Sequence, residues 1–216
     1  NWARLKDMEA FDYDDKLLSS RPPAFITDDA AQGSERAWTK LRALSKEQKS
    51  FDYDVDVCGG TLGLFFATSL LLRNPGMKIA ILEAGELKGR AQEWNISRKE
   101  MEELVEFGVL SEDDVLACVT TEFAGCRSGF KNSEVTPLEG GYFENEVGYE
   151  TFTPDVLNLG VSPQFLLERV TLRFRALGGT ILERTRLQGI CVSETVGTAL
   201  DIGDDADVLT SRLVLD

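Results

Sequence analysis

The chain has 216 residues, of which 43% are hydrophobic and 28% charged, a composition typical of one or two folded domains and unlike that of disordered or collagen-like chains. Its 23 Lys and Arg residues against 37 Asp and Glu residues give a net charge of -14, which repels phosphate backbones, so we expect no nucleic-acid partner. The sequence has no histidine, which excludes His-based acyl transfer and His-ligated zinc or haem, and no metal site is predicted.

The most apolar run, residues 62–72, is 11 residues long, whereas a membrane-spanning helix needs about 20. We therefore expect no transmembrane segment, although peripheral association with a membrane is compatible with the sequence. The first 15 residues are too acidic for a transit peptide and too polar for the core of a signal peptide, so residue 1 is not expected to be a native start.

Residues 1–50 differ in charge from the rest of the chain, because they hold nine acidic and nine basic side chains and leave the whole net charge to residues 51–216. This boundary predicts an N-terminal extension followed by one domain. A polar loop over 27–34 is expected between two short helical segments, the second over 35–46. Two interpretations stay open: an extension that packs loosely on its own domain, and an arm that docks on another protein.

From Tyr53 the pattern becomes strand, glycine turn, helix and strand. Residues 53–57 are expected to form a strand, and the helix over 64–73 ends at the Asn-Pro-Gly segment 74–76. The next strand, within 77–83, is apolar on both faces, as a buried parallel strand is. The sequence therefore predicts a βαβ unit at the start of this domain.

The following segments predict further short elements. Capping boxes at Ser97 and Ser111 predict two helices, and a third is expected to begin at Pro163 and to end before Gly178. The segment 120–160 is expected to hold long loops or short strands. The last expected strands are 180–183, 187–192 and 211–216, with an acidic turn over 203–207. Because the chain stops just after a strand, we expect an incomplete α/β domain.

The glycine turn fits the dinucleotide-binding fingerprint with Cys58, Gly60 and Gly63 at its three positions, and Gly59 beside the first. Glu83 follows Gly60 by 23 residues at the end of the second strand, where a carboxylate accepts hydrogen bonds from ribose hydroxyls. This carboxylate favours FAD or NAD over NADP, and a purely structural turn is the alternative. The predicted cofactor-binding residues of this unit are Cys58, Gly59, Gly60, Thr61, Gly63, Glu83 and Ala84.

Three segments, VDVCGGTLGLFFA, KIAILEAG and GRAQEWNIS, resemble the N-terminal half of the plant and algal plastid FAD-dependent oxidoreductases that include lycopene cyclases. The resemblance covers about residues 53–216 and implies an α/β, Rossmann-like FAD/NAD(P)-binding domain without its substrate domain. It also implies that Arg90 contacts the flavin nucleotide, that Gln92 and Trp94 line the cofactor, and that strand 187–192 flanks the adenosine.

Two functions remain open from the sequence. The first is an FAD-binding oxidoreductase or lycopene-cyclase-like flavoprotein that acts on a small apolar substrate, such as a carotenoid or isoprenoid, in the plastid stroma or at the thylakoid surface, with FAD favoured over NAD. The second is a non-enzymatic assembly or linker subunit of a thylakoid pigment-protein complex that keeps the fold and contacts a partner through residues 1–50. No catalytic residue is assigned in either case.

Overall fold

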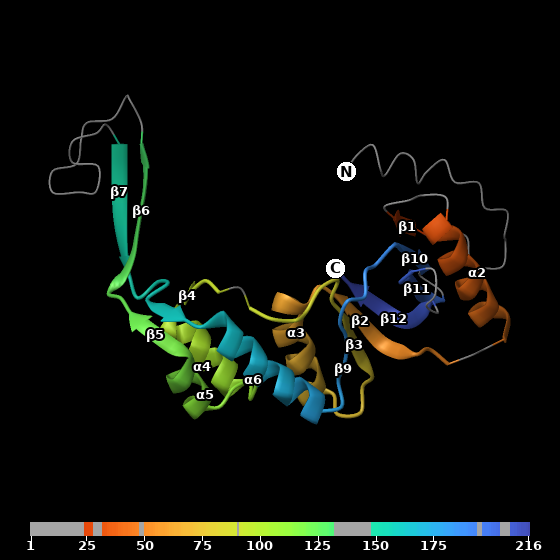
Figure 1. Ribbon diagram of the computed structural model, residues 1–216, viewed down its shortest axis with the longest axis horizontal. Helices are drawn as coiled ribbons and strands as arrows, with labels where there is room; N and C mark the ends of the chain where they lie inside the picture. The colour runs from red at the N-terminus through yellow and green to blue at the C-terminus, as the bar shows by residue number, and fades with distance from the viewer. Residues whose placement is uncertain are drawn as a thin grey trace. The chain divides into compact units, whose positions relative to one another are not determined.

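The computed structural model describes residues 24–27, 32–47, 50–89, 91–131, 148–193, 196–203 and 208–216 (Figure 1). They form two compact units. The first holds the described residues up to Leu87 together with Thr171–Asp216, and the second holds Lys88–Val170. Each unit has its own sheet, so each is described by itself.

The first unit is built on a seven-stranded mixed sheet in the order β1-β10-β11-β12-β2-β3-β9. Strands β12, β2, β3 and β9 are parallel, whereas β1, β10, β11 and the start of β12 pair antiparallel. The strands are β1 Ala24–Thr27, β2 Tyr53–Cys58, β3 Ile79–Leu82, β9 Thr180–Leu182, β10 Gly189–Ser193, β11 Gly197–Asp201 and β12 Leu209–Leu215.

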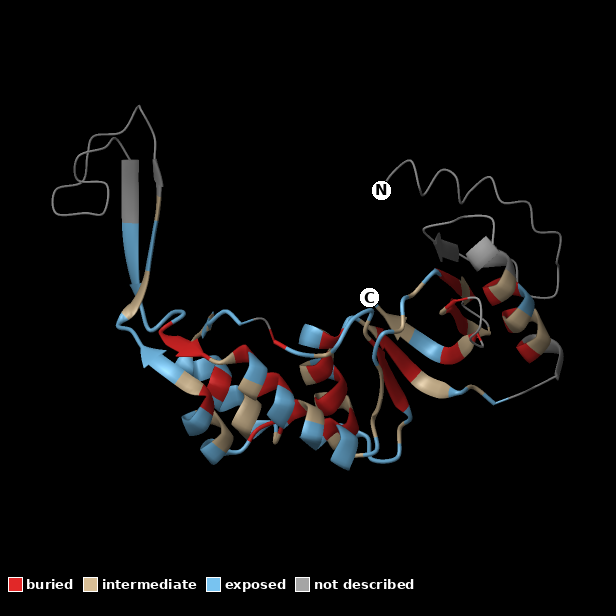
Figure 2. Cartoon of the chain, viewed as in Figure 1, coloured by how far each residue is buried: buried red, intermediate tan, exposed pale blue. Residues whose placement is uncertain are grey.

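The predicted βαβ unit is confirmed as β2, α3 (Gly60–Arg73) and β3. All four residues of β3 are buried, as expected for an apolar strand covered on both faces (Figure 2). Helix α3 ends where Asn74 donates its N–H to the Leu70 carbonyl at 2.8 Å, and Gly76 then adopts a φ of 90°. Because parallel strands present their carboxyl ends at one edge, this unit brings the ends of β2 and β3 beside the start of α3.

Helix α2 (Gln32–Glu47) packs on β10 and β11, which differs from a loosely packed extension. One face of the helix is buried against Cys191 and Ala199, and the apolar spacing along it explains the packing. The buried residues of that face are Ala37, Trp38, Leu41 and Leu44. Strand β1 pairs with β10 in the segment before the helix, and the rest of the predicted extension, 1–23 and 28–31, lies outside the described residues.

The C-terminal part of this sheet contains one strand that the sequence pattern does not predict. Strand β11 lies between β10 and β12, and its first residue, Gly197, has a φ of 135°. A Cβ at Gly197 would lie 2.7 Å from the Phe51 ring, so glycine is required there by space as well as by φ. Most of the expected acidic turn, residues 204–207, lies outside the described residues.

The second unit holds a three-stranded sheet, in the order β4-β8-β5, and a two-stranded ribbon of β6 and β7. Its strands are β4 Trp94–Ile96, β5 Val119–Glu122, β6 Gly125–Lys131, β7 Gly148–Pro154 and β8 Leu159–Val161. These confirm short strands within the described part of 120–160. Residues 132–147 lie outside it.

Both capping boxes are confirmed at the starts of α4 (Arg98–Glu106) and α5 (Glu112–Cys118). Ser97 donates its N–H to the Glu100 carboxylate at 2.8 Å, and the Ser111 hydroxyl accepts from the Asp114 N–H at 3.1 Å. Helix α6 (Pro163–Ala176) begins at the predicted proline; its residues up to Val170 are counted with this unit. Among the described helices, none is both long and apolar enough to span a membrane.

Candidate functional site

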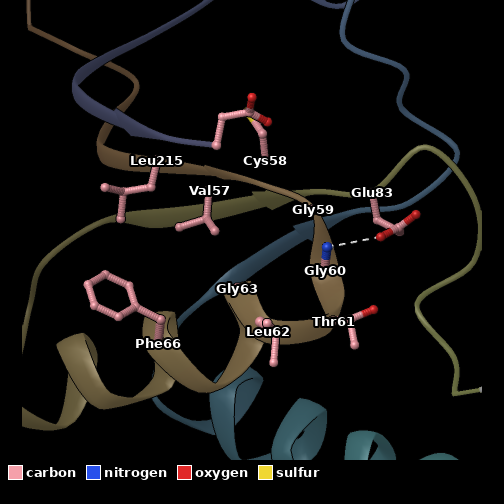
Figure 3. Close-up of a pocket in the computed structure, with 11 residues that line it drawn as sticks. Val57, Cys58, Gly59, Gly60, Thr61, Leu62, Gly63, Phe66, Glu83 and Leu215 are labelled. Carbon is pink, nitrogen blue, oxygen red and sulfur yellow. Dashed lines mark hydrogen bonds between the residues drawn. The ribbon is translucent and has the colours of Figure 1, made fainter. Parts of the chain in front are cut away.

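A cavity of about 510 Å³ opens at the carboxyl ends of β2 and β12 beside the first turn of α3 (Figure 3). The glycine turn forms one wall, and Glu83 and the last residues of β12 form others. This is the edge of a parallel α/β sheet at which ligands bind. The cavity is therefore lined by the end of β2, the glycine turn, the start of α3 and Glu83. This is the position at which the sequence predicts a dinucleotide site.

Gly59 makes the sharp turn from β2 into α3, because its φ of 99° lies in the region that favours glycine. Its N–H donates to the Leu82 carbonyl at 2.9 Å. Cys58, at the first position of the fingerprint, is still part of β2 and pairs with Leu82. Figure 3 shows the Cys58 side chain pointing away from α3. The turn therefore accommodates Cys58 and places the conformational requirement on Gly59.

Gly63 allows α3 to approach β2 closely. A Cβ at Gly63 would lie 2.6 Å from Cγ1 of Val57, which is buried under the helix. A Cβ at Gly60 would contact Leu87 and lie 3.0 Å from Oε2 of Glu83. Gly63 therefore makes the close helix-strand contact of the third glycine in a dinucleotide-binding turn, whereas Gly60 is required by its contacts with Leu87 and Glu83.

Glu83 holds its carboxylate at the start of α3. Oε2 accepts a hydrogen bond from the Gly60 N–H at 2.9 Å, and Oε1 accepts one from the Gly85 N–H at 3.0 Å (Figure 3). The backbone of Glu83 is fixed in turn by bonds with Leu182 and Thr185. Each carboxylate oxygen has two lone pairs, so both keep the capacity to accept a further hydrogen bond from a ligand hydroxyl.

The structure brings most of the predicted site residues together. Those that line the cavity are Cys58, Gly59, Gly60, Thr61, Gly63 and Glu83. Ala84 is exposed after Glu83 and does not line it. Arg90 lies outside the described residues, and Gln92 and Trp94 belong to the second unit, where Trp94 begins β4. For these last three, cofactor contact stays a prediction.

Several lining residues were not predicted. Leu62 and Phe66, one turn apart on α3, are 80% and 51% exposed and form an apolar wall. The sequence favours a core position for the Phe-rich start of this helix, which holds for Leu64 but not for Phe66. Leu62 and Phe66 are four residues apart and lie opposite the buried stripe of α3, and this spacing could have predicted that they share an exposed face. Asp216 also lines the cavity. It reaches this position because β12 pairs with β2, a long-range pairing that the sequence alone does not reveal.

The pKa of Cys58, in the cavity wall, is affected by burial and by the carboxyl groups of Asp216 and Asp56. Burial raises the pKa of the Cys58 thiol to about 12, and repulsion from Asp216 and then Asp56 adds to the effect. Asp56, in the middle of β2, is 0% exposed, and burial raises the pKa of its carboxyl to about 6. An ionised Asp56 therefore adds negative charge behind the cavity wall at Cys58.

Cys58 is expected to resist alkylation in the folded protein. With a pKa of about 12, the thiol has a thiolate fraction at pH 8 about a thousandfold below that of an unperturbed cysteine. Mass spectrometry after iodoacetamide treatment should show little label on Cys58 in buffer and full label in denaturant. Equal labelling rates in both conditions would contradict the environment described for this side chain.

Comparison with known proteins gives similarity of structure only. No protein-family model and no curated protein matches the chain. The halogenase PltM in complex with phloroglucinol and FAD has a TM-score of 0.53 at 14% identity, over 75% of this chain and 33% of that one. The Diels-Alderase PyrE3 of pyrroindomycin biosynthesis has a TM-score of 0.51 at 17% identity, over 76% and 32%.

These similarities confirm the predicted fold class. The first unit carries a Rossmann-like α/β fold, and one of the similar structures contains FAD. The chain spans about a third of the length of the structures that it matches.

Proposed function

We propose that the chain is the FAD-binding part of a flavin-dependent oxidoreductase. The observation that carries this proposal is the Glu83 carboxylate fixed at the start of α3, beside a glycine turn in which neither Gly60 nor Gly63 has space for a Cβ. Apart from the Gly60 N–H, which donates to Glu83, the first-turn N–H groups of α3 have no partner within a helix and are suited to a pyrophosphate. Glu83 is suited to ribose hydroxyls. Bound FAD would supply electron and hydride transfer.

The residues present fit this group. A Cβ at Gly60 would collide with Leu87 and one at Gly63 with Val57, so both fingerprint positions require glycine, and Gly59 supplies the positive φ that directs the chain into the helix. A carboxylate at the end of β3 disfavours the 2′-phosphate of NADP. The FAD held by the similar halogenase structure supports FAD over NAD.

The substrate and location of the whole protein rest on the sequence resemblance. The segment GRAQEWNIS supports a lycopene-cyclase-like flavoprotein that acts on an apolar carotenoid or isoprenoid in a plastid, in the stroma or peripherally at the thylakoid surface. A protein partner for residues 1–50 stays a prediction. The assembly-subunit alternative gains no support from the glycine turn, because Cys58 is accommodated within β2.

Glu83→Ala is expected to weaken FAD binding tenfold or more, because hydrogen bonds to a charged group contribute about 1.5–3 kcal/mol. Quenching of flavin fluorescence on titration measures the affinity. Glu83→Gln, which keeps an acceptor at this position, should lose less. Glu86→Ala is the matched control, because Glu86 is exposed on the same segment, pairs with Arg184 and does not line the cavity.

Circular dichroism of each variant checks that the fold persists. Unchanged FAD affinity in a folded Glu83→Ala protein would overturn the site. A wild-type protein that neither releases flavin on denaturation nor binds added FAD would overturn the proposed function and favour the non-enzymatic alternative.

A further inference from the structure

Asp56 occupies a position where a parallel sheet otherwise takes an apolar side chain. It lies between Val55 and Val57 in β2 and pairs with Ala80 of β3 and Val214 of β12. The residue is 0% exposed, and neither carboxylate oxygen has a hydrogen-bond partner among the described residues. Burying an unpaired carboxylate is costly, and buried polar groups are as a rule hydrogen-bonded. Packing therefore does not explain this residue.

The side chain of Asp56 lies on the face of the sheet that carries Cys58, because residues two apart on a strand share a face. Cys58 lines the cavity, and Asp216 at the end of β12 acts on the same thiol. Asp56 lies two residues before Cys58 in β2 and Asp216 lines the cavity beside it, so both carboxylates lie close to the cavity wall, and their repulsion raises the pKa of Cys58. A pyrophosphate at the adjoining turn, Gly59 and Gly60, would lie in their electric field.

Among the described residues, no positively charged group acts on the pKa of Asp56. Burial is the main cause of the raised pKa of Asp56. The nearby Ser211 hydroxyl on β12, which donates to the Leu213 carbonyl at 3.0 Å, lowers that pKa, and repulsion from Asp52, just before β2, raises it further. The neighbouring strand β3 presents Ala80 and Leu82 to this face, both apolar. Because no such group in the described part of the chain neutralises the carboxylate, Asp56 loses its negative charge in the folded chain only by taking up a proton.

We propose that binding of the dinucleotide pyrophosphate is coupled to protonation of Asp56, so that the bound form takes up a proton from solvent. Neutral Asp56 removes one negative charge from beneath the glycine turn and favours the anionic ligand. By linkage, the bound anion favours the neutral carboxyl to the same extent. This inference rests on the proposed function and adds a pH-dependent control of the same site.

The sign follows from the pKa of about 6 for Asp56 in the ligand-free protein. Below that pH the carboxyl is neutral and the dinucleotide binds more tightly, and above it the charge opposes binding. Couplings between sites are typically about 5- to 150-fold in affinity. We expect the lower end, about fivefold, because Asp56 lies behind the wall of the cavity and not in it.

The test measures FAD affinity at pH 5.5 and pH 7.5 for the wild-type chain and for Asp56→Asn. FAD is the probe because its pyrophosphate is a diester that does not titrate in this range, unlike the terminal phosphate of ADP. We expect the wild-type affinity to fall about three- to fourfold between the two pH values, because with a pKa of about 6 a fivefold coupling is not fully expressed at pH 5.5. The affinity of Asp56→Asn should stay constant and, at pH 7.5, exceed that of the wild type.

Asp54→Asn is the matched control. Asp54 lies on the same strand, but a hydrogen bond from the Lys78 N–H and the Arg212 guanidinium lower its pKa, so it stays ionised across the range. This variant should keep the wild-type pH dependence. Equal wild-type affinity at both pH values, or a pH dependence retained in Asp56→Asn, would overturn the coupling.

Calorimetry of the wild-type chain at pH 6.5, in two buffers with different ionisation enthalpies, gives a test that needs no variant. Proton uptake on FAD binding supports the coupling, and its absence overturns it. Absence of FAD binding at every pH overturns the proposed function itself, which distinguishes the two failures.

Discussion

Gly63→Val is expected to lower the free energy of unfolding by about 3 kcal/mol, because overfilling a packed interface forces side chains and backbone apart. Even the first added atom, Cβ, would lie 2.6 Å from Cγ1 of Val57. Val57 is 3% exposed and lies beneath the helix, so it has no solvent space into which to move. Helix α3 must then separate from β2. Urea denaturation followed by circular dichroism measures the loss.

The Val57→Ala background provides the control for this clash. Removing both Cγ atoms of Val57 makes room for the new side chain, so the double variant should lose less than the sum of the single losses by about 1 kcal/mol or more. Purely additive losses would mean that Gly63 is needed for another reason. The same shift of α3 should also weaken FAD binding, since the helix start carries the N–H groups offered to the pyrophosphate.

The local elements of this fold could be predicted from the sequence because their signals are local. The capping serines Ser97 and Ser111, the glycine turn and Pro163 each act within one helical turn, and the helices begin where these residues place them. The continuous apolar run of β3 likewise predicts that the strand is buried on both faces, as it is in the structure. Such signals do not depend on which segments meet in space.

The pairings that the sequence pattern does not reveal are long-range. Strand β1 joins β10 across more than 160 residues, with Phe25 opposite Cys191. Helix α2 is amphipathic, but only the sheet that it covers shows that it is not a loose extension. The neutral charge over residues 1–50 marks a change in composition, and it does not reveal that α2, within this range, packs on β10 and β11.

The candidate site shows the same division. The fingerprint residues Gly60 and Gly63 and the carboxylate of Glu83 are recognisable by spacing, because one supersecondary unit positions them. Asp54 and Asp56 occupy alternate positions of β2, and the sequence pattern does not distinguish one from the other. Only the structure distinguishes them, since Arg212 pairs with Asp54 while Asp56 is buried without a partner among the described residues.

Asp56→Val is expected to raise the free energy of unfolding by about 3 kcal/mol at pH 8, and by about half as much at pH 5. Burial raises the pKa of the folded-state carboxyl from 3.8 to about 6. A raised pKa means that the folded chain binds the proton more tightly than the unfolded chain. Stability is therefore greatest below the unfolded-state pKa and falls as the pH rises through the folded-state value.

Valine suits this buried strand position and removes the titrating group, so the gain should grow with pH. Asp54→Val is the control with the opposite sign, because the pKa of Asp54 is lowered by the Lys78 N–H and Arg212 and its charge stabilises the folded state. Urea denaturation of the three chains at both pH values separates the titration from any constant change in packing. A gain independent of pH would contradict the account of Asp56. The expected gain also means that Asp56 lowers the stability of the wild-type chain above pH 6. A role of Asp56 in proton-coupled binding would explain why a destabilising residue occupies this position.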